Sequence, residues 1–304
     1  MGIVKIGIIG AGSIGLLFAA YLSKAFSVTL YTKTSEQAEI INQNGIYLQE
    51  GAAQSRVSIH AFPVSKWTGL EELTIIAVKQ YQLHSIIHQV TSLEFIPHNL
   101  LFLQNGMSHL KLLENIPATN IFVGSVEHGA SKVNTYTVSH NGKGAINVAL
   151  FKGGVETIKE FAELSTAIHF PITLKEDYYN MLINKLIANA VINPLSAILQ
   201  VKNGELITNT FYFAAVKKLF LEISFILNLE DPIKSFRDVL RICKKTCHNR
   251  SSMLKDLEEG RRTEIDAILG FLIEEAQVQR KTATNIESYY YLIKGKEKDR
   301  RGVN

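Results

Sequence analysis

Short β-branched runs alternate with segments of helical period in the first part of the chain. The run from Val4 to Ile9 has the character of a buried strand, the helical pattern "LLFAAYLSKA" follows, and "SVTLYTK" predicts a second strand. Three later runs, "LTIIAVKQYQ", "NLLFLQNGM" and "NIFVGSVEHGA", also predict strands. Strands that alternate with helices are typical of an α/β, Rossmann-type domain with a parallel sheet.

The pattern changes after about residue 174. Long segments of helical period follow, among them "KEDYYNMLINKLIANAVI", "NTFYFAAVKKLFLEISFILN" and "TEIDAILGFLIEEAQVQ". A chain of 304 residues with 46% hydrophobic composition is long enough to build two cores. We therefore expect a Rossmann-like nucleotide-binding domain over residues 1–174 and a mostly α-helical domain over residues 175–304.

A glycine-rich turn joins the first strand to the first helix. Gly10 permits a tight turn, Gly12 lets the backbone approach a pyrophosphate, and Gly15 allows close packing of the helix on the strand. The helix N-terminus offers unpaired N–H groups and a positive dipole end to phosphates. By composition the segment also resembles a secretory signal or a membrane span, but the order of strand, turn and helix favours a dinucleotide-binding motif.

The end of the second strand bears on the choice of cofactor. NAD-dependent domains usually carry an acidic residue there for the ribose 2′-hydroxyl, whereas this chain reads Tyr31-Thr32-Lys33-Thr34. A cation and two hydroxyls suit a 2′-phosphate, which favours NADP(H). The alternative is that Lys33 is an ordinary surface lysine.

Polar residues also follow the later strands. Lys79 and the pair Asn105-Gly106 stand where two strands end, and ligands of parallel sheets lie beyond the carboxyl ends of the strands. His128 follows another strand and could act as an acid. A single histidine at a strand end is more often structural, and that is the interpretation we prefer.

Charge and cysteine content exclude several classes of function. The net charge is +4 with dispersed basic residues, so nothing indicates a nucleic-acid or membrane partner, and the basic run "KGKEKDRR" reads as a solvated tail. Cys243 and Cys247 lie four apart in a stretch that reads as helix, without the further Cys or His pairs of a metal site. We expect no metal and a cytoplasmic protein with reduced thiols.

The apolar segment "NKLIANAVINPL" carries an unexpected polar stripe. Lys185, Asn189 and Asn193 recur every four residues, which places them on one side of a helix. A solvated edge would explain such a stripe, and so would a binding site. Pro194 should disrupt helical hydrogen bonding at the end of the stripe and help to orient Asn193.

Taken together, these motifs resemble those of the ketopantoate reductases (2-dehydropantoate 2-reductases) over essentially the whole chain. The motifs that carry the resemblance are "GAGSIG", "AVKQYQ", "QNGM", "NKLIANAVINPLSAI", "NGEL" and "SSMLKDLEEGRRTEID". The glycine motif alone would fit many dehydrogenase families, but the set in this order is restrictive. Near the C-terminus, "QRKTATNIESYYYLIK" lacks a glycine and a proline that many members carry, so a loop there should differ.

The resemblance implies a role for each matching residue. It implies that Lys185 and Glu264 are catalytic. From the sequence alone, Glu264 would instead be interpreted as an exposed glutamate on a helix surface. It implies a substrate site of Asn105, Asn189, Asn193, Ser252 and, less strongly, Asn203. It implies a cofactor site of Gly10, Ala11, Gly12, Ser13, Ile14, Gly15, Lys33, Lys79, Asn105, Ala130 and Glu264.

The activity implied by the resemblance is NADPH-dependent reduction of 2-dehydropantoate to (R)-pantoate, a step of pantothenate and coenzyme A synthesis. The resemblance further implies a small-molecule 2-oxo acid as substrate. The sequence leaves the oligomeric state open, with a homodimer as one candidate. Because lysine lacks the planar fork of arginine, selectivity for NADPH should be weaker than is usual. Two alternatives stay open: a reductase of another small branched 2-oxo acid, and a non-catalytic NADP-binding sensor.

Overall fold

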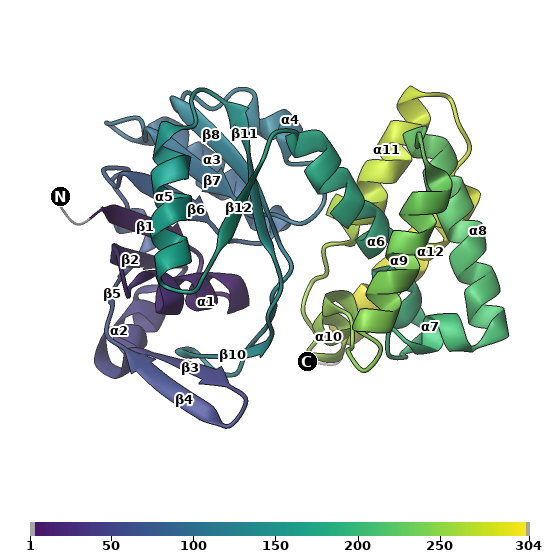
Figure 1. Ribbon diagram of the computed structural model, residues 1–304, viewed down its shortest axis with the longest axis horizontal. Helices are drawn as coiled ribbons and strands as arrows, with labels where there is room; N and C mark the ends of the chain where they lie inside the picture. The colour runs from purple at the N-terminus through teal and green to yellow at the C-terminus, as the bar shows by residue number, and fades with distance from the viewer. Residues whose placement is uncertain (1–3, 302–304) are drawn as a thin grey trace. The chain divides into compact units, whose positions relative to one another are not determined.

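A computed structural model describes residues 4–301 of the chain, which form two compact units (Figure 1). The first comprises the described residues up to Gln104 together with Leu110–Met181, and the second comprises Asn105–His109 and the residues from Leu182 onward. The division falls inside one continuous helix, α6 (Tyr178–Leu199), because this helix starts in the first unit and continues into the second. The sequence instead placed the boundary after residue 174, where helical period begins.

The first unit is built on an eight-stranded sheet, and its strands confirm the predicted Rossmann-like fold class. From one edge to the other the order is β12-β11-β8-β7-β6-β1-β2-β5. All neighbours pair in parallel except β11 and β8, which are antiparallel. The strands are β1 (Lys5–Ile9), β2 (Ser27–Thr32), β5 (His60–Pro63), β6 (Leu73–Ile76), β7 (Asn99–Phe102), β8 (Asn120–Val126), β11 (Ile146–Lys152) and β12 (Ile172–Lys175).

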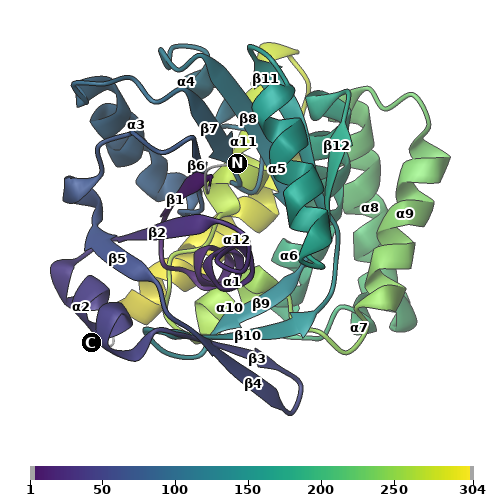
Figure 2. The ribbon, with the colours of Figure 1, turned by 60° about the vertical axis from the view of Figure 1, so that its left-hand side comes forward.

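A smaller sheet and several helices complete this unit. The smaller sheet has the order β4-β3-β10-β9, and helix α1 lies against β3, β9 and β10 (Figure 2). Its strands are β3 (Ile46–Glu50), β4 (Ala53–Val57), β9 (Gly129–Lys132) and β10 (Thr137–Gly142). The helices are α1 (Ser13–Leu22), α2 (Ser35–Asn44), α3 (Leu83–Ser92), α4 (Leu110–Leu113) and α5 (Glu156–Ala167), with 3₁₀ turns η1 (Val64–Lys66) and η2 (Gln80–Gln82). Helix α1 is apolar on all sides and buried from Gly15 onward, as expected of a helix enclosed by two sheets.

The second unit is helical, as the sequence predicted. Its elements are α6, α7 (Glu205–Thr208), α8 (Thr210–Leu227), α9 (Pro232–Lys245), α10 (Ser252–Glu258), the π-helical segment η3 (Asp266–Gly270), α11 (Phe271–Val278) and α12 (Thr284–Arg301). Among the described residues, only α6 is long and apolar enough to cross a membrane. Since 72% of its apolar window is buried inside the protein, α6 is explained as a core helix.

Helix α6 runs through Pro194 to Leu199. Proline offers no backbone N–H for a helical hydrogen bond, but Asn193, Pro194 and their neighbours are buried, and this packing keeps the helix continuous. One local prediction in the helical unit was wrong: Cys247 does not share a helix with Cys243, because α9 ends at Lys245. The carbonyl of Cys247 instead accepts a hydrogen bond from the backbone N–H of Gly204 (3.1 Å).

Candidate cofactor and substrate site

The turn between β1 and α1 has the geometry that a dinucleotide-binding motif requires. Gly10 adopts φ +111°, a conformation that favours glycine, and its backbone N–H donates to the carbonyl of Tyr31 (2.8 Å). A Cβ added at Gly15 would lie 1.7 Å from the Gly10 carbonyl oxygen, so only glycine lets the helix approach this closely. Around Gly12, by contrast, no other described residue has an atom within 4 Å of an added Cβ. The backbone is therefore open where a pyrophosphate would approach.

The first turn of α1 directs its backbone N–H groups toward this open space. Gly12 is the N-cap residue, and Ser13 and Ile14 begin the helix without an acidic side chain in its first turn. Such an end carries partial positive charge and suits a phosphate. The residues present thus fit the dinucleotide that the sequence predicts.

Lys132 was missed by sequence reasoning and lies beside the same turn. Its ammonium Nζ donates to the carbonyl oxygen of Ala11 (3.1 Å), which also accepts from Nε2 of Gln37 (3.3 Å). Lys132 ends strand β9, far from the glycine turn in the sequence, and only the folded sheet brings the two together. Its ammonium group therefore lies next to the glycine turn.

The glycine turn gives a paired prediction. Gly15→Ala should lower the free energy of unfolding by about 1–3 kcal/mol, the usual cost of forcing atoms into a packed interior, because the new methyl meets backbone. Gly12→Ala should change stability by less than about 1 kcal/mol, since the site is open, yet weaken NADPH binding. Thermal unfolding and fluorescence titration measure the two effects. Equal destabilisation by both substitutions would contradict this geometry.

The end of β2 presents Lys33 to solvent. Thr32 is buried and its hydroxyl donates to the carbonyl of Thr34 (2.7 Å), while the Thr34 side chain caps α2 by accepting from the backbone N–H of Gln37 (3.2 Å). These contacts fix the backbone on both sides of Lys33, whose side chain is exposed. The structure therefore places a cation at the position that the sequence assigned to 2′-phosphate binding.

One carboxylate lies near this strand but is already engaged. The hydroxyl of Tyr31 and the indole Nε1 of Trp67 (3.0 Å) both donate to the side chain of Glu71. Burial, followed by the hydrogen bond and charge of Glu71, raises the pKa of Tyr31 well above its usual value. Glu71 thus links Tyr31 of β2 to Trp67.

His128 is part of a polar chain that joins α1 to the smaller sheet. His128 Nδ1 and His140 Nε2 are 2.8 Å apart, His140 Nδ1 and the Tyr21 hydroxyl are 2.8 Å apart, and that hydroxyl donates to Glu50 (2.7 Å). Burial and the neighbouring His140 lower the pKa of His128 to about 4, so the ring is neutral near pH 7. This supports the structural interpretation of His128. Strand β9 pairs with β10, and Ala130 lies opposite His140 in this pairing.

In the helical unit, the side chains of the polar stripe of α6 are partly or fully buried. Lys185 and Asn189 are half-buried, and Asn193 is only 6% exposed. A solvated edge would be exposed along its length, so that interpretation does not fit. The stripe is therefore part of the interior of the unit, and its role in substrate binding stays a prediction.

A serine pair connects the stripe to the segment that carries Ser252. The Ser196 hydroxyl donates to the Ser251 hydroxyl (2.7 Å), and Ser251 in turn caps α10 by accepting from the N–H of Leu254 (3.1 Å). Ser252 is the first residue of α10 and is exposed. Ser196 lies about one turn beyond Asn193 on α6, so this contact holds Ser252 near the end of the stripe.

Asn203 and Lys79 each form hydrogen bonds within their own unit. The Asn203 side chain is buried, and its Nδ2 donates to the hydroxyl of Thr246 (2.9 Å), which anchors the connection after α6. Lys79 is half-buried in the first unit, directly before the 3₁₀ turn η2, and its backbone N–H donates to Gln82 (3.3 Å). The roles of both residues in ligand binding stay predictions.

Asn105 and Glu264 lie 159 positions apart in the chain and are hydrogen-bonded to each other. The amide Nδ2 of Asn105 donates to a carboxylate oxygen of Glu264 (2.8 Å). Next to it, Gly106 adopts φ +80°, and an added Cβ would lie 2.1 Å from the carbonyl oxygen of Ala267. Gly106 therefore packs closely against Ala267 in the π-helical segment η3. Glu264 is half-buried rather than exposed.

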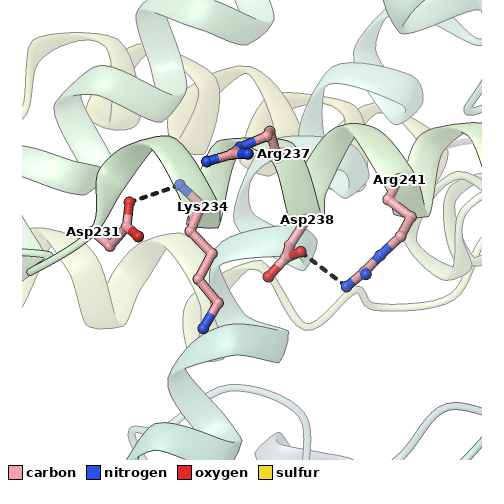
Figure 3. A pocket seen from close by; sticks show the side chains of 5 residues that line it. All are labelled: Asp231, Lys234, Arg237, Asp238 and Arg241. Carbon is pink, nitrogen blue, oxygen red and sulfur yellow. Dashed lines mark hydrogen bonds and ion pairs between the residues drawn. The ribbon is translucent and has the colours of Figure 1, made fainter.

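A hollow of about 430 Å³ on helix α9 contains none of the predicted site residues (Figure 3). It is lined by Asp231, Lys234, Arg237, Asp238 and Arg241. Two of these side chains, Asp238 and Arg241, form an exposed ion pair (2.8 Å), and Asp231 caps the helix. Such contacts are typical of a solvated helix surface. Among the described residues, no group of His, Cys, Asp or Glu could hold a metal ion.

Comparison with known proteins identifies the family. Residues 6–153 match the family model "Ketopantoate reductase PanE/ApbA", and residues 177–297 match the model of its C-terminal domain. A curated 2-dehydropantoate 2-reductase of Bacillus subtilis (strain 168) is 42% identical over 302 residues, which covers 99% of this chain and 100% of that protein. One from Listeria innocua is 36% identical and covers 98% of each chain.

Solved structures agree with this result. The crystal structure of a probable 2-dehydropantoate 2-reductase from Bacillus subtilis has a TM-score of 0.86 at 42% identity and covers 96% of this chain and 100% of that one. A D-mandelate dehydrogenase in a ternary structure with NADH and anilino(oxo)acetate has a TM-score of 0.88 and covers 98% of this chain and 99% of that one. At 22% identity it shows the shared fold alone. The chain belongs to the ketopantoate reductase family.

Proposed function

We propose that this protein reduces 2-dehydropantoate to (R)-pantoate with NADPH, a step of pantothenate and coenzyme A biosynthesis. Family membership and the names of the relatives at 36% and 42% identity support the reaction. The observation that carries it in this chain is the hydrogen bond between Asn105 and Glu264, since these residues come from two separate family motifs. The experiment is NADPH oxidation with 2-dehydropantoate as substrate, with pantoate identified as the product.

The first unit holds the cofactor in this proposal. The glycine turn from Gly10 to Gly15 and the ammonium of Lys132 receive the pyrophosphate, while Lys33 receives the 2′-phosphate. Lys79 and Ala130 of this unit are further candidate contacts, and so are Asn105 and Glu264, which belong to the second unit. When bound, NADPH supplies the hydride that reaches the ketone carbon of the substrate.

The second unit supplies the groups that act on the substrate. As the ketone carbon is reduced, negative charge develops on its oxygen, and the ammonium of Lys185 stabilises that charge and delivers a proton. Asn189, Asn193 and Ser252 bind the polar groups of the substrate, with Asn203 as a weaker candidate. Glu264 accepts a hydrogen bond from the substrate hydroxyl or orients Lys185, and Asn105 fixes its carboxylate.

Two alternatives make different predictions. A reductase of another small branched 2-oxo acid would keep the fold and the role of Lys185 but prefer a different substrate. The fold also occurs in D-mandelate dehydrogenase, so the fold alone does not select the acid. An NADP-binding sensor would bind the cofactor without turnover. The presence of both Lys185 and Glu264 disfavours the sensor, which needs only the features of the first unit.

We further propose that the protein is a cytoplasmic homodimer. A ketopantoate reductase from Staphylococcus aureus with this fold is described as dimeric, at 19% identity and a TM-score of 0.80. Size-exclusion chromatography with light scattering tests the proposal, and a mass near 33.9 kDa at micromolar concentration would contradict it.

The two lysines beside the cofactor site give a paired prediction. Lys33→Ala should weaken NADPH binding by about ten-fold or more and leave NADH binding unchanged, because only NADPH carries the 2′-phosphate. Lys132→Ala should weaken both cofactors alike, because both carry the pyrophosphate near the Ala11 carbonyl. Fluorescence titration gives the dissociation constants. Lys143→Ala, at a side chain that is 80% exposed, is the matched control. An equal loss of both cofactors in Lys33→Ala would refute the assigned phosphate contact.

A further inference from the structure

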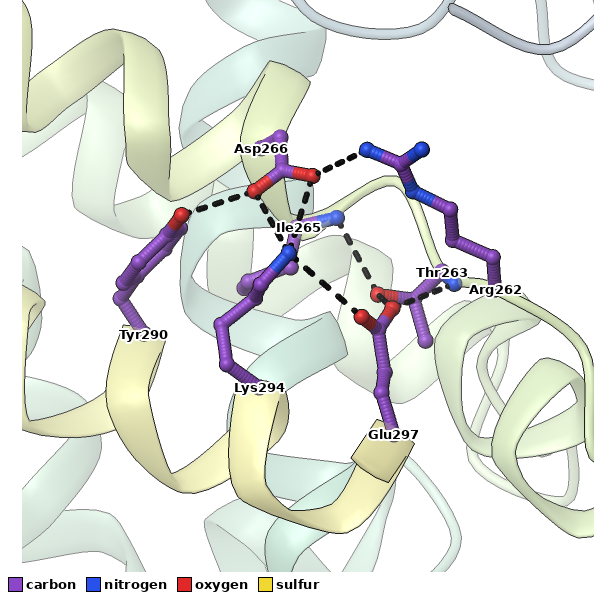
Figure 4. A network of polar contacts seen from close by, with 7 residues as sticks. All are labelled: Arg262, Thr263, Ile265, Asp266, Tyr290, Lys294 and Glu297. Atoms are coloured by element: carbon purple, nitrogen blue, oxygen red, sulfur yellow. Dashed lines mark hydrogen bonds and ion pairs between the residues drawn. The ribbon is translucent and has the colours of Figure 1, made fainter. Parts of the chain in front are cut away.

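Three side chains of α12 contact the segment that carries Glu264. Tyr290, Lys294 and Glu297 are spaced by about one helical turn and lie on one face of the helix (Figure 4). They meet residues 262–266, which flank Glu264 on both sides (Figure 4). The contacts therefore hold Thr263 and Asp266, on either side of one predicted catalytic residue.

Glu297 forms the contact on the N-terminal side of Glu264. One oxygen of its carboxylate accepts from both the backbone N–H (2.6 Å) and the hydroxyl (2.7 Å) of Thr263, which is 1% exposed. The other oxygen lies 3.6 Å from the ammonium of Lys294. The Glu297 side chain is only 5% exposed, and a buried carboxylate is stable only with such partners. The hydroxyl of Thr263 also accepts from the N–H of Ile265 (3.2 Å), so the contact reaches across Glu264.

Asp266 forms the contact on the C-terminal side. Its carboxylate accepts from Arg262 (2.9 Å), from the hydroxyl of Tyr290 (2.8 Å) and from Lys294 (3.1 and 3.2 Å). Burial alone would raise the pKa of Asp266, but these hydrogen bonds outweigh it and lower the pKa. Lys294 lies between the two carboxylates and joins both contacts into one network.

Three sets of hydrogen bonds fix Glu264 and the residue before it. The residue before it is held by Glu297, its own carbonyl accepts from the N–H groups of Ala267 (3.1 Å) and Ile268 (3.2 Å), and its carboxylate accepts from Asn105. Of these three sets, the first depends on a charged side chain from a distant helix. Loss of that side chain would leave two buried donors of Thr263 without an acceptor.

We propose that Glu297 is a positioning residue that holds the carboxylate of Glu264 in place through Thr263. This inference rests on the proposed catalytic role of Glu264. Glu297 does not take part in the chemistry, since its carboxylate is occupied by Thr263 and Lys294. Its effect on the reaction therefore passes through Glu264.

The test is a double-mutant cycle with Glu297→Met and Glu264→Ala. Glu297→Met keeps a side chain of similar length but removes both carboxylate oxygens, so Thr263 loses its acceptor. It should lower kcat/KM by about ten- to a hundred-fold, the range expected when a reacting group is displaced by about an ångström. In the Glu264→Ala background the same substitution should have little further effect. Glu287→Met, at an exposed glutamate of the same helix, is the matched control and should leave kcat/KM unchanged.

Two variants of Thr263 separate positioning from general stability. Thr263→Ser keeps both donors and should retain near-normal kcat/KM, whereas Thr263→Val removes the hydroxyl and should reproduce part of the Glu297→Met defect. NADPH affinity and the thermal unfolding midpoint are measured for every variant, and folded variants that bind NADPH are compared.

The outcomes distinguish this inference from the proposed function. A normal kcat/KM for Glu297→Met, or an equal loss in both backgrounds, would overturn the positioning role while the unmodified enzyme still reduces its substrate. An unmodified protein that binds NADPH but reduces no 2-oxo acid would overturn the proposed function instead, together with the catalytic role of Glu264. The cycle is run with the 2-oxo acid that the unmodified protein reduces fastest, so a change of substrate leaves the test intact.

Discussion

Replacement of Lys185 by alanine is expected to lower kcat by about two to four orders of magnitude, the usual range for a lost general acid. The reason is that this ammonium acts as charge develops on the substrate oxygen, so its loss affects the transition state more than ground-state binding. Affinity for NADPH should survive, because the cofactor contacts of the first unit are untouched. Single-turnover kinetics and fluorescence titration measure the two quantities.

A conservative variant separates the two functions of Lys185. In Lys185→Arg the positive charge remains, but a guanidinium does not release its proton in proteins, so charge stabilisation persists without proton delivery. We expect its kcat to fall between those of the unmodified enzyme and Lys185→Ala. Lys202→Ala, at an exposed lysine just after α6, is the control. Near-normal turnover of a folded Lys185→Ala variant would end the proposed role.

Removal of one hydroxyl from the substrate is expected to have the second large effect. The acid 2-oxo-3-methylbutanoate lacks the terminal hydroxyl of 2-dehydropantoate, and its kcat/KM should be lower by about a hundred-fold or more. A site built to bond a hydroxyl discriminates strongly against an analogue without it, because buried polar groups are left unpaired. Steady-state kinetics with the two acids give the ratio directly.

Glu264 should account for much of this discrimination. Glu264→Ala removes the proposed hydroxyl acceptor, so it should reduce kcat/KM for 2-dehydropantoate far more than for the analogue. Asn105→Ala should act in the same direction, because it removes the hydrogen bond that fixes the Glu264 carboxylate. If both acids already show similar kcat/KM with the unmodified enzyme, the site does not recognise the hydroxyl and the broader 2-oxo acid reductase is the better assignment.

The sheet of the first unit could be predicted from sequence because its signals are local. Strands β1, β6 and β7 are buried almost throughout, and a short apolar run between turns reflects that burial directly. The glycine positions likewise follow from local backbone geometry at Gly10 and Gly15. The helical period of the second unit is a local signal of the same kind.

Contacts between distant parts of the chain carry no such signal. Nothing in the order of residues places Lys132 beside the carbonyl of Ala11 or Asn105 beside Glu264, since both contacts depend on packing between distant segments. The hydrogen bond from Thr263 to Glu297 could not be predicted from the sequence for the same reason. The continuity of α6 through Pro194 is related, because the burial of this helix outweighs a local helix-breaking preference.

The most direct test of the proposed function is NADPH oxidation by the unmodified protein against a panel of 2-oxo acids. The panel contains 2-dehydropantoate, 2-oxo-3-methylbutanoate and the 2-oxo acid that corresponds to mandelate, and each acid is also tested with NADH. The proposal predicts that 2-dehydropantoate has the highest kcat/KM, that NADPH is preferred, and that pantoate forms in equal amount to the NADPH consumed. A higher kcat/KM for another acid, or NADPH binding without turnover of 2-dehydropantoate, would contradict it.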